Sequence, residues 1–458
     1  MRRSAALLLG LGVAGACDDP PAGRGAAAAP PEGAAVVAAR PRDVIVLTLD
    51  TFRADRMGCY GHPGGLTPHL DRIAAEGTRF AHAMAPMPCT APAHAALFTG
   101  LSPRLCGVTS NFLTAPDTLD TLAERLARLG FATGALFNAF DFAAINLVQG
   151  FDGFGLDKGR RAERLVPELK RYLQSTRGRR RFTWLHLFIP HGPHDLPPEF
   201  AARVTARYDG PLQEDFFSME KLRTGEVVAP PEFVERYRQR YDAAIAFTDA
   251  RVGEIRAAFE AERAWDDALL LVVTDHGESL EGRTLGFHAP VLNQETLHAA
   301  MLWRGPGVPA GRVKDQLAQP MDAVPTVFEL LGEPIPGELE GRSLAELITS
   351  DDPDGVDWTR HAIASLPTRF EGKSGEDGEA AAIRSGRFVL LLREGRDRAL
   401  HDVVADPRQT TDIAADHPDV VRALEAAFEE WVRATREAPT GGVVSPEMAA
   451  QLRKLGYQ

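Results

Sequence analysis

A threonine hydroxyl near the start of an expected helix is the first feature of this sequence that suggests chemistry. Thr90 lies two residues before Pro92, and good helix formers continue from there to Gly100. Because Pro favours the first helical position, we expect Thr90 just outside the helix N-terminus, near N–H groups that the helix does not use. Such an end suits phosphate or sulfate, which an activated hydroxyl can attack. Alone, the stretch is more typical of an ordinary helix start.

Carboxylates and an imidazole follow two apolar runs elsewhere in the chain. Asp50 comes directly after the run Val44–Leu49, and Asp275 and His276 come directly after the run Ala268–Thr274. Short continuous apolar runs are typical of buried parallel strands. Ligands of such sheets bind beyond the carboxyl ends of the strands. The three side chains are therefore predicted to lie together there, as ligands of a divalent cation.

Strand-like and helix-like segments alternate through most of the chain, which predicts an α/β fold with a mostly parallel sheet covered on both faces. The expected strands are Val44–Leu49, Ala132–Phe137, Phe182–Phe188, Ala268–Thr274 and Ala300–Trp303. The expected helices are Thr67–Glu76, Leu119–Leu129, Pro167–Ser175, Pro231–Arg263 and Met321–Leu331.

The motifs, in this order and spacing, resemble those of the sulfatase family in the alkaline phosphatase superfamily, from about Val44 to Gln458. The resemblance implies an alkaline-phosphatase-like central sheet. It implies that Asp50, Thr90, Asp275 and His276 bind one divalent metal. The motifs are Leu49–Asp55, Gly58–Gly61, Thr67–Asp71, Pro88–Gly100, His186 with Pro190-His191, Thr274–Glu278, Arg304–Gly307 and Gly341–Leu344.

The metal-binding motif departs from the family pattern at one position. Sulfatases usually carry a second Asp after the first, whereas this chain has Thr51. The remaining ligand set of two carboxylates and one imidazole favours Mn²⁺, Zn²⁺ or Mg²⁺ over Ca²⁺, which prefers more oxygen ligands.

The nucleophile position departs further from the family pattern. Sulfatases place a Cys or Ser two residues before the Pro and convert it to formylglycine, but this chain has Thr90 there. Thr cannot become formylglycine, because its β-carbon carries a methyl group. Cys89 lies one residue too early, and His94 replaces the usual Arg. We therefore expect an unmodified threonine nucleophile, as in phosphodiesterases of the superfamily, with phosphate diesters favoured over sulfate esters.

Several further histidines match positions that the family uses at its active site. The resemblance implies catalytic roles for His191 and His288, and substrate binding by His94, His186, His191 and His288. His194 replaces a common aromatic residue and Ile189 a common Asp, and these two changes weaken the case for a second metal. Cys106 replaces a common His, a further loss at the rim of the site. Arg53 and Asp55 are expected either to buttress the Asp50 loop or to form a surface salt bridge. A structural hydrogen-bonding role remains the alternative for each histidine.

Residues 1–17 resemble a bacterial lipoprotein signal peptide. Arg2 and Arg3 precede a short apolar stretch, and small residues lead to Cys17, the predicted lipidation site. Ordinary signal cleavage near Ala16 is the alternative. Residues 18–42 are rich in Pro, Ala and Gly, which predicts a flexible linker. We therefore expect export to the periplasm or cell envelope, with the membrane reached only through a lipid anchor.

The rest of the chain is predicted to form a catalytic domain at 43–348 and a small C-terminal α+β subdomain at 349–458. In the subdomain we expect strands at Ala381–Ser385, Phe388–Leu392 and Ala399–Asp402, a helix at Val420–Arg433 and an exposed loop at 375–379. The net charge of -12 argues against nucleic acid as a partner.

Together these features predict a metal-dependent hydrolase or transferase of sulfate or phosphate esters, on a small-molecule, glycan or lipid-linked substrate. The alternative is a catalytically impaired, membrane-tethered binding protein that keeps the fold.

Overall fold

An eight-stranded, mostly parallel sheet forms the centre of the fold, as predicted. The computed structural model describes residues 41–352, 356–366, 369–370, 373–374, 380–393, 398–435 and 442–455, which belong to the unit Ala38–Gln458. The predicted signal peptide with Cys17, the linker up to residue 40 and the loop at 375–379 lie outside the described residues.

The strand order in the large sheet is β5-β4-β6-β1-β7-β8-β2-β9. Neighbours from β5 to β7 run parallel, β8 is antiparallel to both β7 and β2, and the edge strand β9 is parallel to β2. The strands are β1 Asp43–Leu49, β2 Thr78–Met84, β4 Ala132–Asn138, β5 Gly153–Asp157, β6 Arg181–Leu187, β7 Ala268–Thr274, β8 His298–Arg304 and β9 Arg312–Ala318.

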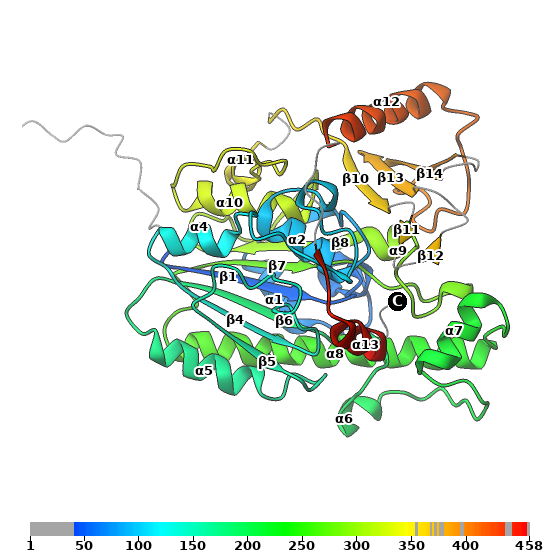
Figure 1. Cartoon of the computed structure of the whole chain (residues 1–458), viewed down its shortest axis with the longest axis horizontal. Helices are drawn as coiled ribbons and strands as arrows, with labels where there is room; N and C mark the ends of the chain where they lie inside the picture. The colour runs from blue at the N-terminus through cyan, green and yellow to red at the C-terminus, as the bar shows by residue number, and fades with distance from the viewer. Residues whose placement is uncertain are drawn as a thin grey trace, which may run out of the picture. The chain divides into compact units, whose positions relative to one another are not determined.

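Helices cover both faces of this sheet because its central strands are apolar on both sides. Along β1, Val44 and Val46 pack into one hydrophobic core, and Ile45 and Leu47 into the other. Figure 1 shows α5 and α8 along one face and α4, α10 and α11 along the other. The larger helices are α1 Pro68–Ala75, α2 Thr90–Thr99, α4 Leu122–Arg128, α5 Leu165–Ser175, α7 Phe216–Thr224, α8 Pro231–Ala261 and α10 Ala323–Leu330. The shorter ones are α3 Pro103–Cys106, α6 Pro198–Ala201, α9 Gln294–Leu297 and α11 Ala345–Thr349.

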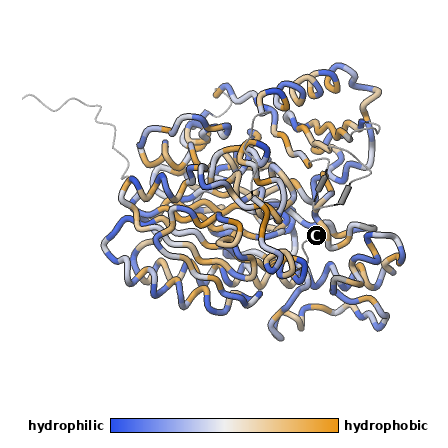
Figure 2. Tube along the Cα trace, viewed as in Figure 1, coloured by the Kyte–Doolittle hydropathy of each residue, from blue (hydrophilic) through white to orange (hydrophobic). Residues whose placement is uncertain are grey.

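A small antiparallel sheet with the order β10-β13-β14-β15 forms the C-terminal part. One of its faces packs on α12, and the other packs on apolar residues near the end of β2. Figure 2 shows hydrophobic residues gathered along the strands of both sheets. The elements are β10 Ala362–Leu366, β13 Ala380–Ser385, β14 Phe388–Arg393, β15 Ala399–Asp402 and α12 Pro418–Ala434. Strand β16 Gly442–Val443 pairs with β3 Leu113–Thr114, and helix α13 Pro446–Leu455 follows β16. Strand β11 Arg369–Phe370 pairs with β12 Lys373–Ser374.

Every strand and helix predicted from the sequence is present, with its ends shifted by a few residues at most. Among the strands of the eight-stranded and four-stranded sheets, β2, β5, β9 and β10 were not predicted. The predicted domain boundary at residue 348 stays a prediction. Among the described residues, no helix is both long and apolar enough to cross a membrane.

Candidate functional site

Three predicted ligands meet at the carboxyl end of the parallel strands. Strands β1 and β7 are neighbours in parallel register, with Leu49 opposite Thr274, so the residues that follow them emerge side by side. One ligand atom from each of Asp50, Asp275 and His276 lies within 4.8 Å of the others, and all three residues are buried. The predicted convergence of these side chains is thus present in the fold.

The contacts of Asp275 and His276 direct one atom of each into the cluster. Asp275 Oδ1 accepts the Thr51 N–H at 3.0 Å and the His276 N–H at 2.7 Å. His276 Nδ1 lies 3.0 Å from Gly277 O, and as the donor there it leaves Nε2 as the unprotonated nitrogen. Asp275 Oδ2 and His276 Nε2 lie 3.5 Å apart, and neither atom has a hydrogen-bond partner among the described residues.

This arrangement fits a divalent cation. Burying a carboxylate oxygen and an imidazole nitrogen without partners is costly unless a cation lies between them. Burial, and then the nearby Asp50 carboxylate, raise the pKa of Asp275 above its usual range, against the opposing influence of His276. A bound cation would remove that penalty.

The helix that carries Thr90 begins earlier than predicted. Cys89 is extended and is the N-cap, Thr90 is the first helical residue, and Ala93 N–H makes the first helical bond to Cys89 O at 3.0 Å. The prediction that Thr90 lies outside the helix was wrong. Pro92 is the third helical residue, where a missing N–H is also tolerated, because the first turn has no intrahelical acceptors.

Cys89 points to a different environment from the site. Its side chain is buried in the apolar cluster between the end of β2 and the small sheet, which includes Met84, Met87 and Leu297. Cys89 has an extended backbone whereas Thr90 is helical, so the two neighbouring side chains face different surroundings. Cys106 is also buried, and its thiol contacts Pro103 O at 3.5 Å.

His94 connects the start of α2 to the carboxylates. Its Nδ1 lies 2.8 Å from Thr90 O and 3.9 Å from Asp275 Oδ2. Burial lowers the pKa of His94 to about 3, and the neighbouring His186 adds to the shift. His94 is therefore a neutral imidazole that fixes the first turn of α2 against the ligand cluster.

His186 also reaches the cluster, from strand β6. Its Nδ1 lies 2.9 Å from Thr48 Oγ1, and its Nε2 lies 3.5 Å from Asp50 Oδ2. Its ring centroid is 4.9 Å from that of His94. Burial lowers the pKa of His186 to about 4. The neutral imidazole of His186 thus lines the site beside Asp50.

His191 and His288 extend the cluster on the other side. The ring of His288 lies 4.5 Å from that of His276 and 5.4 Å from that of His191. His288 Nδ1 is 3.4 Å from Glu278 Oε1, and His191 Nδ1 is 2.7 Å from Gly192 O. Burial lowers the pKa of His288 to about 4 and that of His191 well below 6.5, and it raises the pKa of Glu278 to about 7.

His194 belongs to a separate network. Its Nδ1 pairs with Glu214 Oε2 at 2.9 Å, and its ring lies 5.0 Å from that of Tyr237. Although burial opposes it, the adjacent His194 lowers the pKa of Glu214 to about 2. The structure gives His194 a clear hydrogen-bonding role.

Asn111 is a candidate site residue that the sequence did not reveal. It is buried just before β3, and its Oδ1 accepts the N–H of Ala91, next to Thr90, at 2.7 Å. Its Nδ2 has no hydrogen-bond partner among the described residues. Asn111 thus holds the start of α2 and carries an available donor beside it. Nothing in the spacing of one sequence indicates this contact.

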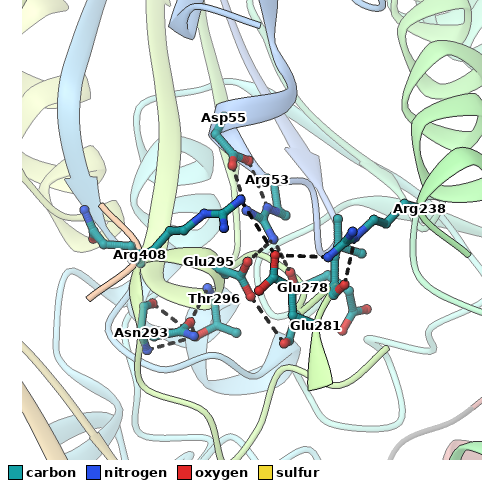
Figure 3. Close-up of polar contacts among 12 residues, drawn as sticks. Arg53, Asp55, Arg238, Glu278, Glu281, Asn293, Glu295, Thr296 and Arg408 are labelled. Carbon is teal, nitrogen blue, oxygen red and sulfur yellow. Dashed lines mark hydrogen bonds and ion pairs between the residues drawn. The ribbon is translucent and has the colours of Figure 1, made fainter. Parts of the chain in front are cut away.

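Arg53 ties the Asp50 loop to the Asp275 loop. Figure 3 shows its guanidinium between Asp55, Glu295 and Glu278. It bonds both Asp55 oxygens at 2.9 and 2.7 Å, pairs with Glu295 Oε1 at 2.9 Å and donates to Glu278 O at 3.2 Å. Arg53 is only 7% exposed. Arg53 is therefore better described as a buttress of the Asp50 loop than as part of a surface salt bridge.

A polar cavity of about 650 Å³ lies beside this buttress. It is lined by Arg53, Arg56, Arg238, Glu281, Glu295 and Arg408, among others, but by none of the three ligand-cluster residues. Its size suits a ligand. The chemistry nevertheless points to the buried cluster, because Asp275 Oδ2 and His276 Nε2 meet there without hydrogen-bond partners among the described residues.

Comparisons with known proteins agree with this geometry. The sequence matches the family described as Sulfatase over residues 42–333. It is 23% identical over 441 residues to arylsulfatase K of Rattus norvegicus, covering 84% of this chain and 77% of that one. The fold is similar to that of a 2-O GAG sulfatase, with a TM-score of 0.71, 16% identity, and coverage of 89% of this chain and 96% of that one. It is also similar to the phosphonate monoester hydrolase of Agrobacterium radiobacter, with a TM-score of 0.70, 22% identity, and coverage of 87% and 95%.

Proposed function

Because the chain belongs to the sulfatase family, an ester-hydrolase family of the alkaline phosphatase superfamily, we propose that it is a metal-dependent hydrolase with Thr90 as its unmodified nucleophile. The observation that supports this most is the meeting of Asp50, Asp275 and His276, with the first turn of α2 held against them through His94. A minimal metal site and a hydroxyl at a helix start are the parts that such a reaction requires.

The metal would be held by one oxygen each from Asp50 and Asp275 and by His276 Nε2. When bound, a divalent cation lowers the pKa of a hydroxyl and offsets the charge of the transferring group. Asn111 anchors the start of α2 through Ala91, and its Nδ2 can donate to an ester oxygen. Such a fixed donor stabilises charge that develops in the transition state.

The proposed reaction has two displacements. The Thr90 hydroxyl oxygen forms a bond to phosphorus while the bond to the alcohol oxygen breaks, and the hydroxyl proton goes to the departing alcohol. Water then attacks the phosphorus of this threonine phosphodiester, which releases the phosphate monoester and restores the Thr90 hydroxyl. The imidazoles of His191 and His288, which lie next to one another, with His288 also next to His276, are the candidate carriers of these protons.

The substrate preference follows from the chemistry of Thr90. Formylglycine hydrate has a second hydroxyl, which lets a sulfated enzyme release sulfate without attack of water on sulfur; threonine lacks this route. We therefore propose that phosphate diesters react faster than sulfate esters. The similarity to a phosphonate monoester hydrolase is in keeping with a phosphorus centre. The burial of Cys89 in an apolar cluster supports Thr90, not Cys89, as the reacting residue.

Metal analysis with a panel of esters tests this function. Purified wild-type protein should hold one divalent metal and hydrolyse aryl phosphate diesters faster than matched aryl sulfates. Asp275→Ala should lose both metal and activity, whereas Asp419→Ala, an exposed change on α12, should keep both. Equal metal in the Asp275→Ala protein and the wild type would show that the metal site is wrongly placed.

We also propose that the protein is exported and tethered through Cys17. This rests on the charged start, the short apolar stretch and the small residues before Cys17. An organic substrate group outside the cytoplasm, such as a glycan or a lipid-linked ester, is in keeping with the similarity to a GAG sulfatase.

A further inference from the structure

Thr51, which directly follows Asp50, has a strained backbone. Its φ is 50°, in the left-handed region. A β-branched residue is a genuine outlier there, because its side chain crowds the backbone. Such strain persists only where surrounding groups hold it, and it is concentrated at functional sites. The turn after Asp50 must therefore be held in place by its neighbours.

Hydrogen bonds on both sides of Thr51 supply this restraint. The Tyr241 hydroxyl on α8 donates to Thr51 O at 2.6 Å and accepts the Arg53 N–H at 3.0 Å. The Thr51 N–H donates to Asp275 Oδ1 at 3.0 Å. The Tyr241 hydroxyl thus bonds the backbone on both sides of the turn at Thr51. The N–H of Thr51 itself bonds the Asp275 carboxylate.

Tyr241 is well suited to act as a fixed clamp. It is fully buried in the core between α8 and the sheet. Burial raises the pKa of Tyr241 well above its usual range, so the hydroxyl keeps the proton that it donates to Thr51 O. The clamp is therefore in place whether or not the site holds a cation.

We propose that Tyr241 is a positioning residue for the metal site: its hydroxyl holds Thr51 in the left-handed conformation, so that the Asp50 and Asp275 carboxylates face one another. This inference rests on the proposed function of these carboxylates. Without the hydroxyl, Thr51 relaxes toward negative φ, its N–H leaves Asp275 Oδ1, and the two carboxylates lose their alignment. Groups that orient metal ligands typically change metal affinity 10–100-fold when they are lost.

A double-mutant cycle on metal affinity tests the clamp. The dissociation constants of Mn²⁺ and Zn²⁺ are measured by titration calorimetry for wild type, Tyr241→Phe, Thr51→Gly and the double variant. Tyr241→Phe should weaken binding about tenfold. Gly adopts positive φ without strain, so Tyr241→Phe should cost less than about threefold in the Thr51→Gly background. Tyr237→Phe, one turn earlier on α8 and equally buried, is the control and should change affinity little.

The outcomes separate the clamp from the function on which it depends. Wild-type affinity in Tyr241→Phe, or the same loss with Gly at position 51, overturns the clamp while the metal site stands. An equal loss in Tyr237→Phe also overturns it, because the effect would then come from core packing. No difference in metal binding between wild type and Asp275→Ala overturns the proposed function and the clamp with it.

Discussion

Replacing Gly277 with alanine should push the loop that carries His276 away from Glu295 and Arg53, against which it packs. An added Cβ would lie 1.9 Å from Glu295 O, 3.0 Å from Glu295 C and 3.3 Å from Arg53 Cγ. The obstacle is backbone, and the Gly277 N–H already bonds Thr296 O at 2.8 Å. The loop can make room only by moving about 1 Å or more, which breaks this bond or displaces Arg53.

The expected cost of Gly277→Ala is about 3 kcal/mol, at the upper end for overpacking, because rigid backbone faces the new methyl group. In a domain of this size that lowers Tm by about 3 °C. Because His276 moves with the loop, metal affinity should also fall about tenfold. Thermal unfolding of the metal-free protein and metal titration measure the two effects separately.

Gly153→Ala is the matched control for this prediction. Gly153 is the first residue of β5, and an added Cβ there meets nothing within 4 Å. Its Tm and metal affinity should stay close to those of wild type. If Gly277→Ala behaves like Gly153→Ala in both measurements, the two loops are not packed together as described.

Three further changes have expected outcomes. Asn111→Ala should lower kcat about 100-fold, as for a lost oxyanion donor, and unchanged steady-state kinetics would remove Asn111 from the site. Metal-free protein should lose stability as pH falls from about 6.5 toward 4, because burial lowers the pKa of His298 to about 4 and that of His94 to about 3, so the unfolded chain binds more protons. Glu278, whose pKa is raised, opposes this loss. A Tm that stays constant between these pH values would contradict the prediction. Cys17→Ser should release soluble protein or leave an uncleaved precursor, whereas unchanged membrane fractionation and processing would exclude the lipid anchor.

The sequence predicts best the elements that are buried on both faces. Strand β7 was predicted residue for residue and β1 within one residue, because each is a continuous apolar run. Strands β5 and β9 were missed because both are edge strands with Gly or charged residues. In β2, polar residues alternate with apolar ones, and His82 is only half-buried.

The same contrast holds for the candidate site. Asp50, Asp275 and His276 could be placed together because parallel neighbours end at the same edge of a sheet. His94 follows Thr90 by one helical turn, so its contact with Thr90 O is local. The contacts of Asn111 and Tyr241 depend on how a loop and a distant helix pack, with Tyr241 190 residues from Thr51 along the chain. Residue spacing carries no information about such contacts.

Identification of the residue that carries the transferred group decides whether Thr90 is the nucleophile. Protein quenched during turnover of a phosphate diester is digested, and the peptide that contains Cys89 and Thr90 is sequenced by mass spectrometry. We predict that Thr90 carries the phosphoryl group with its remaining ester group, that Cys89 is unmodified, and that the Thr90→Ala protein is folded, inactive and unlabelled. An aldehyde at Cys89, or full turnover by Thr90→Ala, would contradict it.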